Sequence, residues 1–247
     1  MLLDERNLRE KEFHNKLQSQ KKNRFENIFY KAISNAWDDF FYYLKIYAKD
    51  STILDYGCGI GSSIEKVLDF NPKKIVGVDI SDVSISKAKK KFKNLENKVE
   101  LIVGNCEETK FDSKTFDVVY GLGIIHHLHT RKCISEISRI LKNDGTLLFI
   151  EPLGTNPVIN LYRKLTPDSR SKDEHPLVGK DLRIIREFFN KLELKYYGFL
   201  TLIFFPFYKY PANSNFFKKL ISLDQFLFKI KFFRLFAWSV LIFAKKN

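Results

Sequence analysis

The 247-residue chain has few of the residues that mark disulfide-bonded, zinc-binding or membrane-spanning proteins. It has three cysteines, Cys58, Cys106 and Cys133, widely spaced and without a C-x-x-C pair. This excludes a disulfide framework or a cysteine zinc site and is typical of a reducing cytosol. The longest apolar stretches, residues 198–208 and 236–244, are shorter than the ~20 residues that span a bilayer. The first residues lack the apolar run of a signal peptide, so we expect a cytoplasmic protein. From the cysteine spacing we expect no metal site.

Positive charge is in excess. The formal net charge is +13, which would attract nucleic acid, an anionic membrane surface or a phosphorylated substrate. The alternative is that scattered lysines only keep the chain soluble. One region stands out, because from Lys195 onward nine basic residues and one acid, Asp224, are interleaved with seventeen aromatic residues.

The hydrophobic pattern of residues 1–151 predicts two helices and then strands that alternate with helices. Residues 1–50 form an N-terminal helical cap, in which Phe13, His14, Phe25 and Tyr30 would fold over a bound ligand or serve as a structural cover. The predicted strands cover residues 52–56, 74–80, 99–103, 116–121 and 146–151. Helices are predicted at 62–70, 84–92 and 133–141. This alternation indicates an α/β fold with a parallel, doubly wound sheet in residues 51–151.

Residues 152–247 are expected to complete the same domain. An irregular segment reaches about residue 179, followed by a helix over 182–192 and a strand over 194–205. An amphipathic helix covers 216–233, and a strand over 238–244 closes the chain. The proline-containing connection leaves no room for a right-handed crossover, so we expect an antiparallel terminal strand in a seven-stranded, mostly parallel sheet.

A glycine-rich turn after the first strand is the most specific motif. Asp55 ends the strand, and Gly57, Gly59 and Gly61 follow at every second position before a helix. Glycines allow positive φ and let a ligand lie against bare backbone, and the helix N-terminus offers N–H groups to an anion. The spacing differs from the G-x-G-x-x-G of dinucleotide enzymes. An acid before the loop would repel a pyrophosphate but attract an ammonium group.

Further polar residues follow the next strands in order. Asp79, followed by Ile80, ends the second strand, where a carboxylate accepts both ribose hydroxyls in doubly wound folds. Asn105 and Cys106 follow the third strand, where a nucleoside base would be held. The carboxyl ends of parallel strands meet at one edge of the sheet, so these residues predict a nucleoside site.

The stretch from Thr52 to Glu151, with ILDYGCGIG, VGVDIS, GNCEETKFDSKTFDVVYGLGIIHHL and LKNDGTLLFIEP, resembles class I S-adenosylmethionine-dependent methyltransferases. Within that class it looks like the ubiquinone/menaquinone-type branch and related small-molecule enzymes. The resemblance implies a Rossmann-like fold with a reversed terminal strand. It also implies S-adenosyl-L-methionine as the cofactor and a small-molecule acceptor methylated on O, N or S. An anionic metabolite or a glycan or lipid precursor would fit.

The resemblance also assigns roles at the cofactor site. Asp55 and the three loop glycines would hold the methionine end, Asp79 the ribose, and Gly121 would lie next to the sulfonium. Asn105 and Cys106 stand where the family usually has Asp-Ala beside the adenine. The amide oxygen of Asn105 can still accept the hydrogen bond of the adenine amino group.

Methyl transfer from a sulfonium needs an aligned nucleophile and, where the acceptor carries a proton, a base. His126 and His127 follow the fourth strand and are candidate bases, because a neutral imidazole suits this task. The alternative is that one of them caps the helix or holds the loop.

The segment that follows the fifth strand is too long and polar for a routine connection, so we interpret it as the acceptor-binding loop. The candidate residues at its start and along it are Glu151, Tyr162, Arg163, Glu174 and His175. Tyr162 and His175 would bind or deprotonate an acceptor, and Arg163 with Arg170 would suit a carboxylate or phosphate. The alternative is that Arg163 and Glu174 pair with each other to fix the loop.

The basic, aromatic segment 215–236 is interpreted as a lid over the acceptor pocket, with contact to an anionic membrane as the alternative. Apolar positions nearly all round its helix indicate burial on more than one side. No RNA-binding motif accompanies the charge, so nucleic acid is a weaker expectation. Three other functions stay open as alternatives: an RNA or protein methyltransferase, a nicotinamide-dependent oxidoreductase and a catalytically silent cofactor-binding protein. The sequence does not indicate an oligomeric state.

Overall fold

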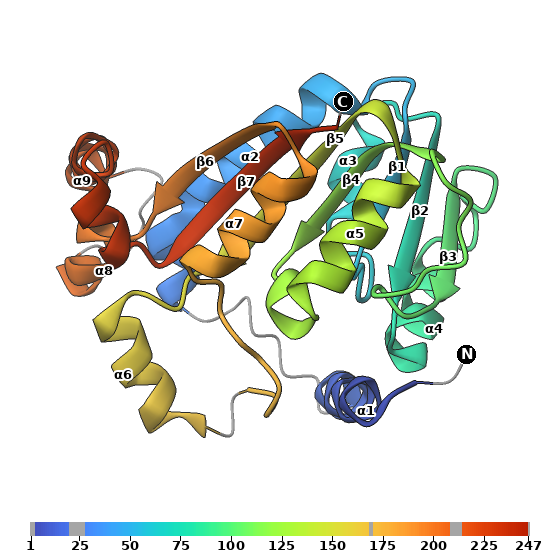
Figure 1. Cartoon of the computed structure of the whole chain (residues 1–247), viewed down its shortest axis with the longest axis horizontal. Coiled ribbons are helices and arrows are strands. Elements are labelled where there is room, and N and C mark those ends of the chain that lie inside the picture. The colour runs from blue at the N-terminus through green and yellow to red at the C-terminus, as the bar shows by residue number, and fades with distance from the viewer. Residues whose placement is uncertain (1–2, 20–27, 168–169, 208–213, 247) are drawn as a thin grey trace.

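One seven-stranded sheet organises the described part of this computed structural model, residues 3–19, 28–167, 170–207 and 214–246 (Figure 1). The strands are β1 (Thr52–Tyr56), β2 (Lys74–Asp79), β3 (Val99–Val103), β4 (Phe116–Leu122), β5 (Leu141–Pro152), β6 (Lys191–Tyr197) and β7 (Ser239–Lys245). Their order is β3-β2-β1-β4-β5-β7-β6. The strands β1 to β5 pair in parallel, and β7 is antiparallel to both β5 and β6. The predicted fold class is confirmed.

The strand order reverses between β1 and β4, which is where open α/β sheets bind ligands beyond the carboxyl ends of the strands. The central strands are apolar runs because helices cover both faces. In β1, for example, Ile53 and Leu54 are fully buried in two different hydrophobic clusters, one on each face.

Two sets of helices cover these faces. On one face lie α2 (Ser34–Ala48), preceded by η2 (Ile28–Ile33), α3 (Ile64–Leu68) and α4 (Asp82–Lys91). On the other lie α5 (Thr130–Ile140) and α7 (Gly179–Phe188). Over the described residues, no helix has both the length and the apolar character needed to cross a bilayer.

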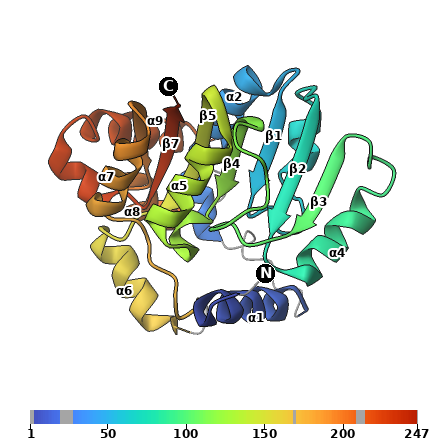
Figure 2. The same cartoon turned by 45° about the vertical axis from the view of Figure 1, so that its right-hand side comes forward.

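Two helices lie at the carboxyl edge of the sheet, as Figure 2 shows: α1 (Glu5–Ser19) and α6 (Pro157–Leu165). The sequence predicted that both N-terminal helices form a cap, but only α1 lies across this edge. Ala36, Phe40 and Leu44 of α2 are instead fully buried in the core against the sheet. Phe25 lies outside the described residues.

The second half differs from the sequence prediction at several boundaries. The strand predicted over 194–205 ends at Tyr197, because Gly198 has φ of +79° and turns the chain into the short helix α8 (Leu200–Ile203). The helix predicted over 182–192 covers Gly179–Phe188. The segment expected to be irregular contains α6, which Asn156 caps through its side chain and Pro157 begins.

The C-terminal elements are η5 (Phe205–Phe207), α9 (Asn215–Leu227) and η7 (Lys231–Phe236). The expectation that α9 is buried on several sides is wrong. Phe217 and Leu220 are buried, whereas Phe216, Leu223 and Phe226 are 44%, 46% and 61% exposed.

Candidate active site

The loop after β1 has the backbone that its glycines predict. Gly57, Gly59 and Gly61 have φ of +76°, +52° and +73°, which other residues rarely adopt. A Cβ on Gly57 would lie 2.6 Å from Ile124, and one on Gly61 would lie 2.6 Å from Phe92. A Cβ on Gly59 would meet nothing within 4 Å. The middle of the loop therefore faces open space, where a ligand can approach bare backbone.

Asp55 lies at the base of this loop and is 2% exposed. Its carboxylate accepts hydrogen bonds from the Ser63 hydroxyl (2.7 Å) and the Tyr120 hydroxyl (2.9 Å). Burial raises the pKa of the Asp55 carboxyl group to about 7, although these two hydroxyls lower it. An approaching cation would favour the ionised form, so the site is suited to an ammonium group.

Asp79, at the end of β2, is tied to the same loop. Its carboxylate accepts the N–H of Gly59 and the N–H of Ser81, each at 2.8 Å. Burial raises the pKa of its carboxyl group, opposed by these N–H groups. Ile80, which follows it, is partly exposed. Asp79 is therefore next to Gly59, the loop residue at which a Cβ would meet nothing within 4 Å.

The residues that the sequence predicts to contact the nucleoside base, Asn105 and Cys106, lie after β3. Asn105 is 6% exposed, and its side-chain oxygen accepts the N–H of Glu107 at 2.9 Å. Burial raises the pKa of the Cys106 thiol well above its usual value, and the backbone oxygen of Cys106 accepts the Tyr56 hydroxyl. These two contacts hold the loop after β3 to itself and to β1.

Gly121, in β4, allows a close approach of neighbouring side chains. A Cβ there would lie 2.4 Å from the Phe149 ring and 2.8 Å from Ile124. A side chain at this position would therefore require the Phe149 ring and Ile124 to shift, whatever Gly121 contacts in the bound state.

Glu151 and His126 form a buried pair. Glu151 is 0% exposed and accepts the backbone N–H groups of Ile124 (2.9 Å), Ile125 (2.8 Å) and His126 (3.3 Å). The His126 Nδ1 atom lies 2.7 Å from the same carboxylate. Burial raises the pKa of Glu151 to about 7. Glu151 therefore fixes η3 (Ile125–His127) and orients the His126 ring, rather than pointing out of the fold.

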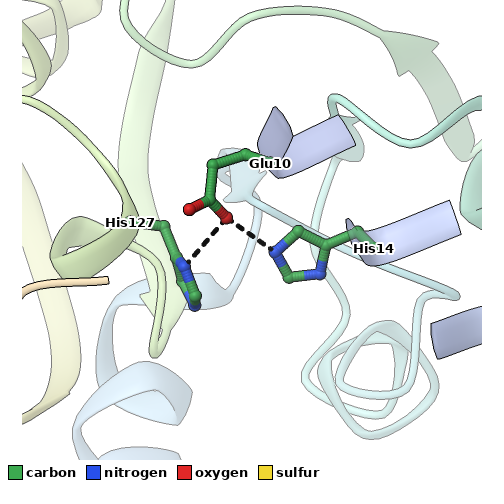
Figure 3. Close-up of side chains that lie close together, drawn as sticks. All are labelled: Glu10, His14 and His127. Carbon is green, nitrogen blue, oxygen red and sulfur yellow. Dashed lines mark ion pairs between the residues drawn. The ribbon is translucent and has the colours of Figure 1, made fainter. Parts of the chain in front are cut away.

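His127 contacts residues of α1. Its Nδ1 atom lies 3.1 Å from Oε2 of Glu10, and Nε2 of His14 lies 3.5 Å from the same oxygen (Figure 3). Burial lowers the pKa of His127 to about 4, so its ring is neutral at physiological pH. His126, His127 and Glu174 also bring one ligand atom each within 4.8 Å of one another. Two histidines predicted from the sequence thus meet an acid of the predicted acceptor loop.

The acceptor loop is tied to itself and to η3. Arg163 donates to the Leu153 carbonyl (2.8 Å), and burial lowers its pKa to about 10. One alternative predicted that Glu174 pairs with Arg163, but Glu174 forms its ion pair with Arg170, at 3.7 Å. The charge of Glu174 nevertheless raises the pKa of Arg163. The Arg170 guanidinium lies 5.7 Å from the centre of the partly buried Tyr162 ring.

His175 is held on the η3 side of this loop. Its backbone N–H donates to the His126 carbonyl at 2.8 Å, and Nε2 lies 3.5 Å from the Thr130 hydroxyl. Burial lowers the pKa of its imidazole. His175 is thus brought next to His126, whereas Tyr162 and Arg163 come from α6.

Sequence reasoning missed several residues that contact the predicted ones or each other: Ser63 and Tyr120 at Asp55, Glu107 at Asn105, Arg6 and Glu10 at His127, and Ser171 at Glu10. The four-residue spacing of Glu10 and His14 was a usable signal, because it puts both on one face of a helix. Tyr120 pairs in register with Asp55 across β1 and β4. That register is not readable from either strand alone.

Comparison with known proteins gives a family for part of the chain. Residues 54–149 match the model of a family described as "Methyltransferase domain". Over 125 residues the chain is 30% identical to a sterol 24-C-methyltransferase from Kluyveromyces lactis, covering 49% of this chain and 33% of that protein. The matched part spans about a third of the length of the sterol methyltransferases to which the chain is similar.

Solved structures show the same fold. A geranyl diphosphate C-methyltransferase from Streptomyces coelicolor A3(2) aligns with a TM-score of 0.63 and 18% identity, over 87% of this chain and 79% of that one. A phosphoethanolamine N-methyltransferase from Haemonchus contortus aligns with a TM-score of 0.58 and 20% identity, over 85% and 52%.

The fold, the glycine loop with its two acids and the family match define a class I S-adenosylmethionine-dependent methyltransferase domain. This chain carries that domain in residues 54–149, which lie within the stretch Thr52–Glu151 that carries the sequence resemblance, and S-adenosyl-L-methionine is the cofactor of the class. A hydrogen bond places Asp79 next to Gly59, and a Cβ on Gly59 would meet open space, which leaves room for a ligand there. Membership of the ubiquinone/menaquinone-type branch stays a prediction.

Proposed function

We propose that the chain transfers a methyl group from S-adenosyl-L-methionine to a small-molecule acceptor at the carboxyl edge of the sheet. The observation that carries the proposal is the bare backbone of Gly59, which faces open space and donates its N–H to Asp79. When bound, the cofactor supplies a methyl group already activated on a sulfonium. The protein's task is therefore to bind, to align and to move a proton.

Each cofactor-binding residue has a role in the proposal. Asp55 pairs with the α-ammonium, and Asp79 accepts the ribose hydroxyls next to Ile80. Asn105 and Cys106 lie against the base, where the second lone pair of the Asn105 oxygen accepts the adenine amino group. Gly121 lies next to the sulfonium, with Phe149 and Ile124 filling the space where a side chain would be.

His126 is the base that the contacts favour where the acceptor carries a proton. Glu151 lies 2.7 Å from Nδ1 of the ring, and in the proposal it holds the proton on Nδ1 and leaves Nε2 to accept the proton of the acceptor. Glu151 is then a positioning residue, because it acts through His126. His175, whose N–H bonds the His126 carbonyl, supports the same turn.

The acceptor is proposed to lie between α1 and α6, against Tyr162, Arg163 and Glu174. Arg163 suits a phosphate or carboxylate of the acceptor. The relatives act, by their names, on sterols, geranyl diphosphate and phosphoethanolamine. Two of these names are C-methyltransferases, so the proposal extends from O, N and S to acceptor carbon.

We further propose that the aromatic edge contacts an anionic membrane, which the exposed side chains favour over a lid. We define the aromatic edge as the exposed apolar residues Phe207, Phe216, Leu223, Phe226, Ile230, Phe232 and Leu235. The neighbouring Lys218, Lys219, Lys229 and Lys231 are exposed. Apolar side chains beside lysines suit an interface with acidic headgroups. An apolar acceptor would then reach the site from the lipid.

Calorimetry and turnover together test the function. We expect S-adenosylhomocysteine to bind with 1:1 stoichiometry and NADH not to bind. Formation of S-adenosylhomocysteine is then measured with a sterol, a prenyl diphosphate, phosphoethanolamine and total RNA as acceptors. Turnover with RNA alone would replace the small-molecule proposal by the nucleic-acid alternative. Binding of NADH alone would overturn both.

His126→Ala tests the proposed base. Turnover should fall by about 10²-fold or more while S-adenosylhomocysteine affinity is retained, because general-base catalysis contributes about 10²–10⁴-fold. His129→Ala, at an exposed histidine three residues later, is the matched control and should retain full turnover. Unchanged turnover in His126→Ala would remove His126 as the base.

A further inference from the structure

The cluster of Glu10, His14 and His127 joins α1 to the turn after β4 through a single carboxylate oxygen. Oε2 of Glu10 lies 3.1 Å from His127 Nδ1 and 3.5 Å from His14 Nε2, and the three ligand atoms lie within 4.8 Å of one another (Figure 3). Glu10 and His14 are one helical turn apart and His127 is more than a hundred residues away. The grouping is therefore a product of the tertiary fold.

Two atoms of this cluster are buried without a hydrogen bond. Glu10 is 4% exposed and His127 is 5% exposed. Among the described residues, Glu10 Oε2 and His127 Nδ1 are two of the few buried side-chain polar atoms that have no hydrogen-bond partner. They lie 3.1 Å apart, and this contact with His127 lowers the pKa of Glu10, but its angles are not those of an ordinary hydrogen bond. Folded proteins rarely leave buried polar atoms unsatisfied, and a bound ion is one way in which such atoms find a partner.

The rest of the carboxylate is anchored. The Ser171 hydroxyl donates to the other oxygen, Oε1 of Glu10, which leaves Oε2 directed at the two imidazole rings. Hydrogen bonds of this kind to the outer atom of a ligand typically orient metal sites.

The distances suit a small divalent ion. With zinc–nitrogen and zinc–oxygen bonds of about 2.0–2.2 Å and tetrahedral angles, neighbouring ligand atoms are about 3.3 Å apart. The separations of Glu10 Oε2 from the two imidazole nitrogens, 3.1 and 3.5 Å, lie on either side of that value, and all three ligand atoms lie within 4.8 Å of one another. Two imidazoles and one carboxylate suit zinc, iron or nickel, whereas magnesium prefers oxygen ligands and water.

We propose that Glu10, His14 and His127 bind one divalent transition-metal ion of the zinc class. Three protein ligands leave a position open, as in catalytic zinc sites. The ion would also fasten α1 to the turn after β4, at the same edge of the sheet as Asp79. Metal binding does not depend on the proposed methyl transfer, so the two can fail separately.

Metal titration of the tag-free, chelator-treated protein tests the proposal. We expect one Zn²⁺ ion per chain by calorimetry and, with Co²⁺, the visible absorption of a tetrahedral ion. Glu10→Gln and His14→Ala should each weaken the affinity at least tenfold, since even loss of an outer-shell contact costs 10–100-fold. His14 is partly exposed, so its removal should not prevent folding.

His129→Ala is the matched control, because His129 is exposed and lies outside the cluster, and it should bind the ion as the unchanged protein does. The affinity for S-adenosylhomocysteine is measured on the same samples. If it is normal while no ion binds, or if His14→Ala and Glu10→Gln bind the ion with unchanged affinity, the metal site is overturned and the proposed function is not. If the ion binds normally but S-adenosylhomocysteine does not bind, the proposed function is overturned and the metal site is not.

Discussion

At the scale of single residues, Asp79 links the glycine loop to the proposed ribose position. Its two oxygens already accept the N–H groups of Gly59 and Ser81, so a change at Asp79 affects both the loop and the ligand. Asp79→Asn should lower S-adenosylhomocysteine affinity at least tenfold, because hydrogen bonds to a charged group contribute about 1.5–3 kcal/mol. Calorimetry measures this, with the exposed Asp112→Asn as control. An unchanged affinity would remove the ribose role.

Asp55 gives the cofactor site a predictable pH dependence. Its pKa of about 7 in the folded protein exceeds the ordinary value of 3.8. The groups that face it are the hydroxyls of Ser63 and Tyr120, the carboxylate of Asp79 and the thiol of Cys58. An ammonium group pairs with the ionised form, so affinity for S-adenosylhomocysteine should fall as pH falls below about 7, by up to tenfold per pH unit. Calorimetry from pH 5.5 to 7.5 checks this.

The same shift affects stability with the opposite sign. A carboxyl group whose pKa is raised on folding stabilises the ligand-free protein below pH 3.8, and this contribution is lost as pH rises through about 7. In Asp55→Asn both pH dependences should flatten. A ligand affinity that stays pH-dependent in that variant would assign the proton to another group.

The sequence predicted much of the cofactor site at this scale, because the acid and glycines of one loop are neighbours in the chain. It did not predict the Ser63 and Tyr120 hydroxyls on Asp55, which depend on strand register. Nor did it predict that Glu151 faces inward, because burial of an acid is decided by the backbone N–H groups around it.

At the scale of elements, Asp224 of α9 determines where α8 begins. Its carboxylate accepts the N–H groups of Phe199, Leu200 and Thr201 and the Thr201 hydroxyl, so an acid from one helix caps another. Asp224→Ala should lower the free energy of unfolding by about 1–3 kcal/mol, since it leaves buried donors without acceptors. Urea unfolding measures this, with the exposed Asp112→Ala as control. An unchanged midpoint would show that α8 forms without this cap.

This cap explains why the strand predicted over 194–205 ends at Tyr197. The apolar run continues past Tyr197, but Gly198 at φ of +79° and the distant Asp224 convert it into a helix. A remote acid cannot be read from the local pattern. By contrast, α6 was missed although Asn156 and Pro157 are a local helix-start signal.

At the scale of the whole molecule, positive charge and exposed aromatic residues combine on the aromatic edge. The protein should sediment with vesicles containing acidic phospholipid and not with neutral phosphatidylcholine vesicles. Binding should weaken with added salt, because each lysine near the surface contributes about 1 kcal/mol and salt screens it. The double variant Phe226→Ser, Phe232→Ser should bind at least tenfold more weakly. Tyr42→Ser removes an aromatic that is 66% exposed on α2 and is the control.

Equal loss of vesicle binding in Tyr42→Ser and in the double variant would contradict a specific membrane face. Binding to acidic vesicles that does not respond to salt would contradict the charge argument. Either result would favour the interpretation of α9 as a lid over the acceptor pocket.

The docking of α1 has a consequence for turnover. Its two buried residues, Asn7 and Glu10, are polar. Ion pairs hold it in place, including Arg9 with Asp173 at 2.8 Å and Lys11 with Asp82 at 2.8 Å. Lifting a helix attached in this way exposes little apolar surface, so in the metal-free protein α1 could leave the carboxyl edge of the sheet without loss of core packing. The rate of product release, and not the rate of methyl transfer, would then depend on ionic strength.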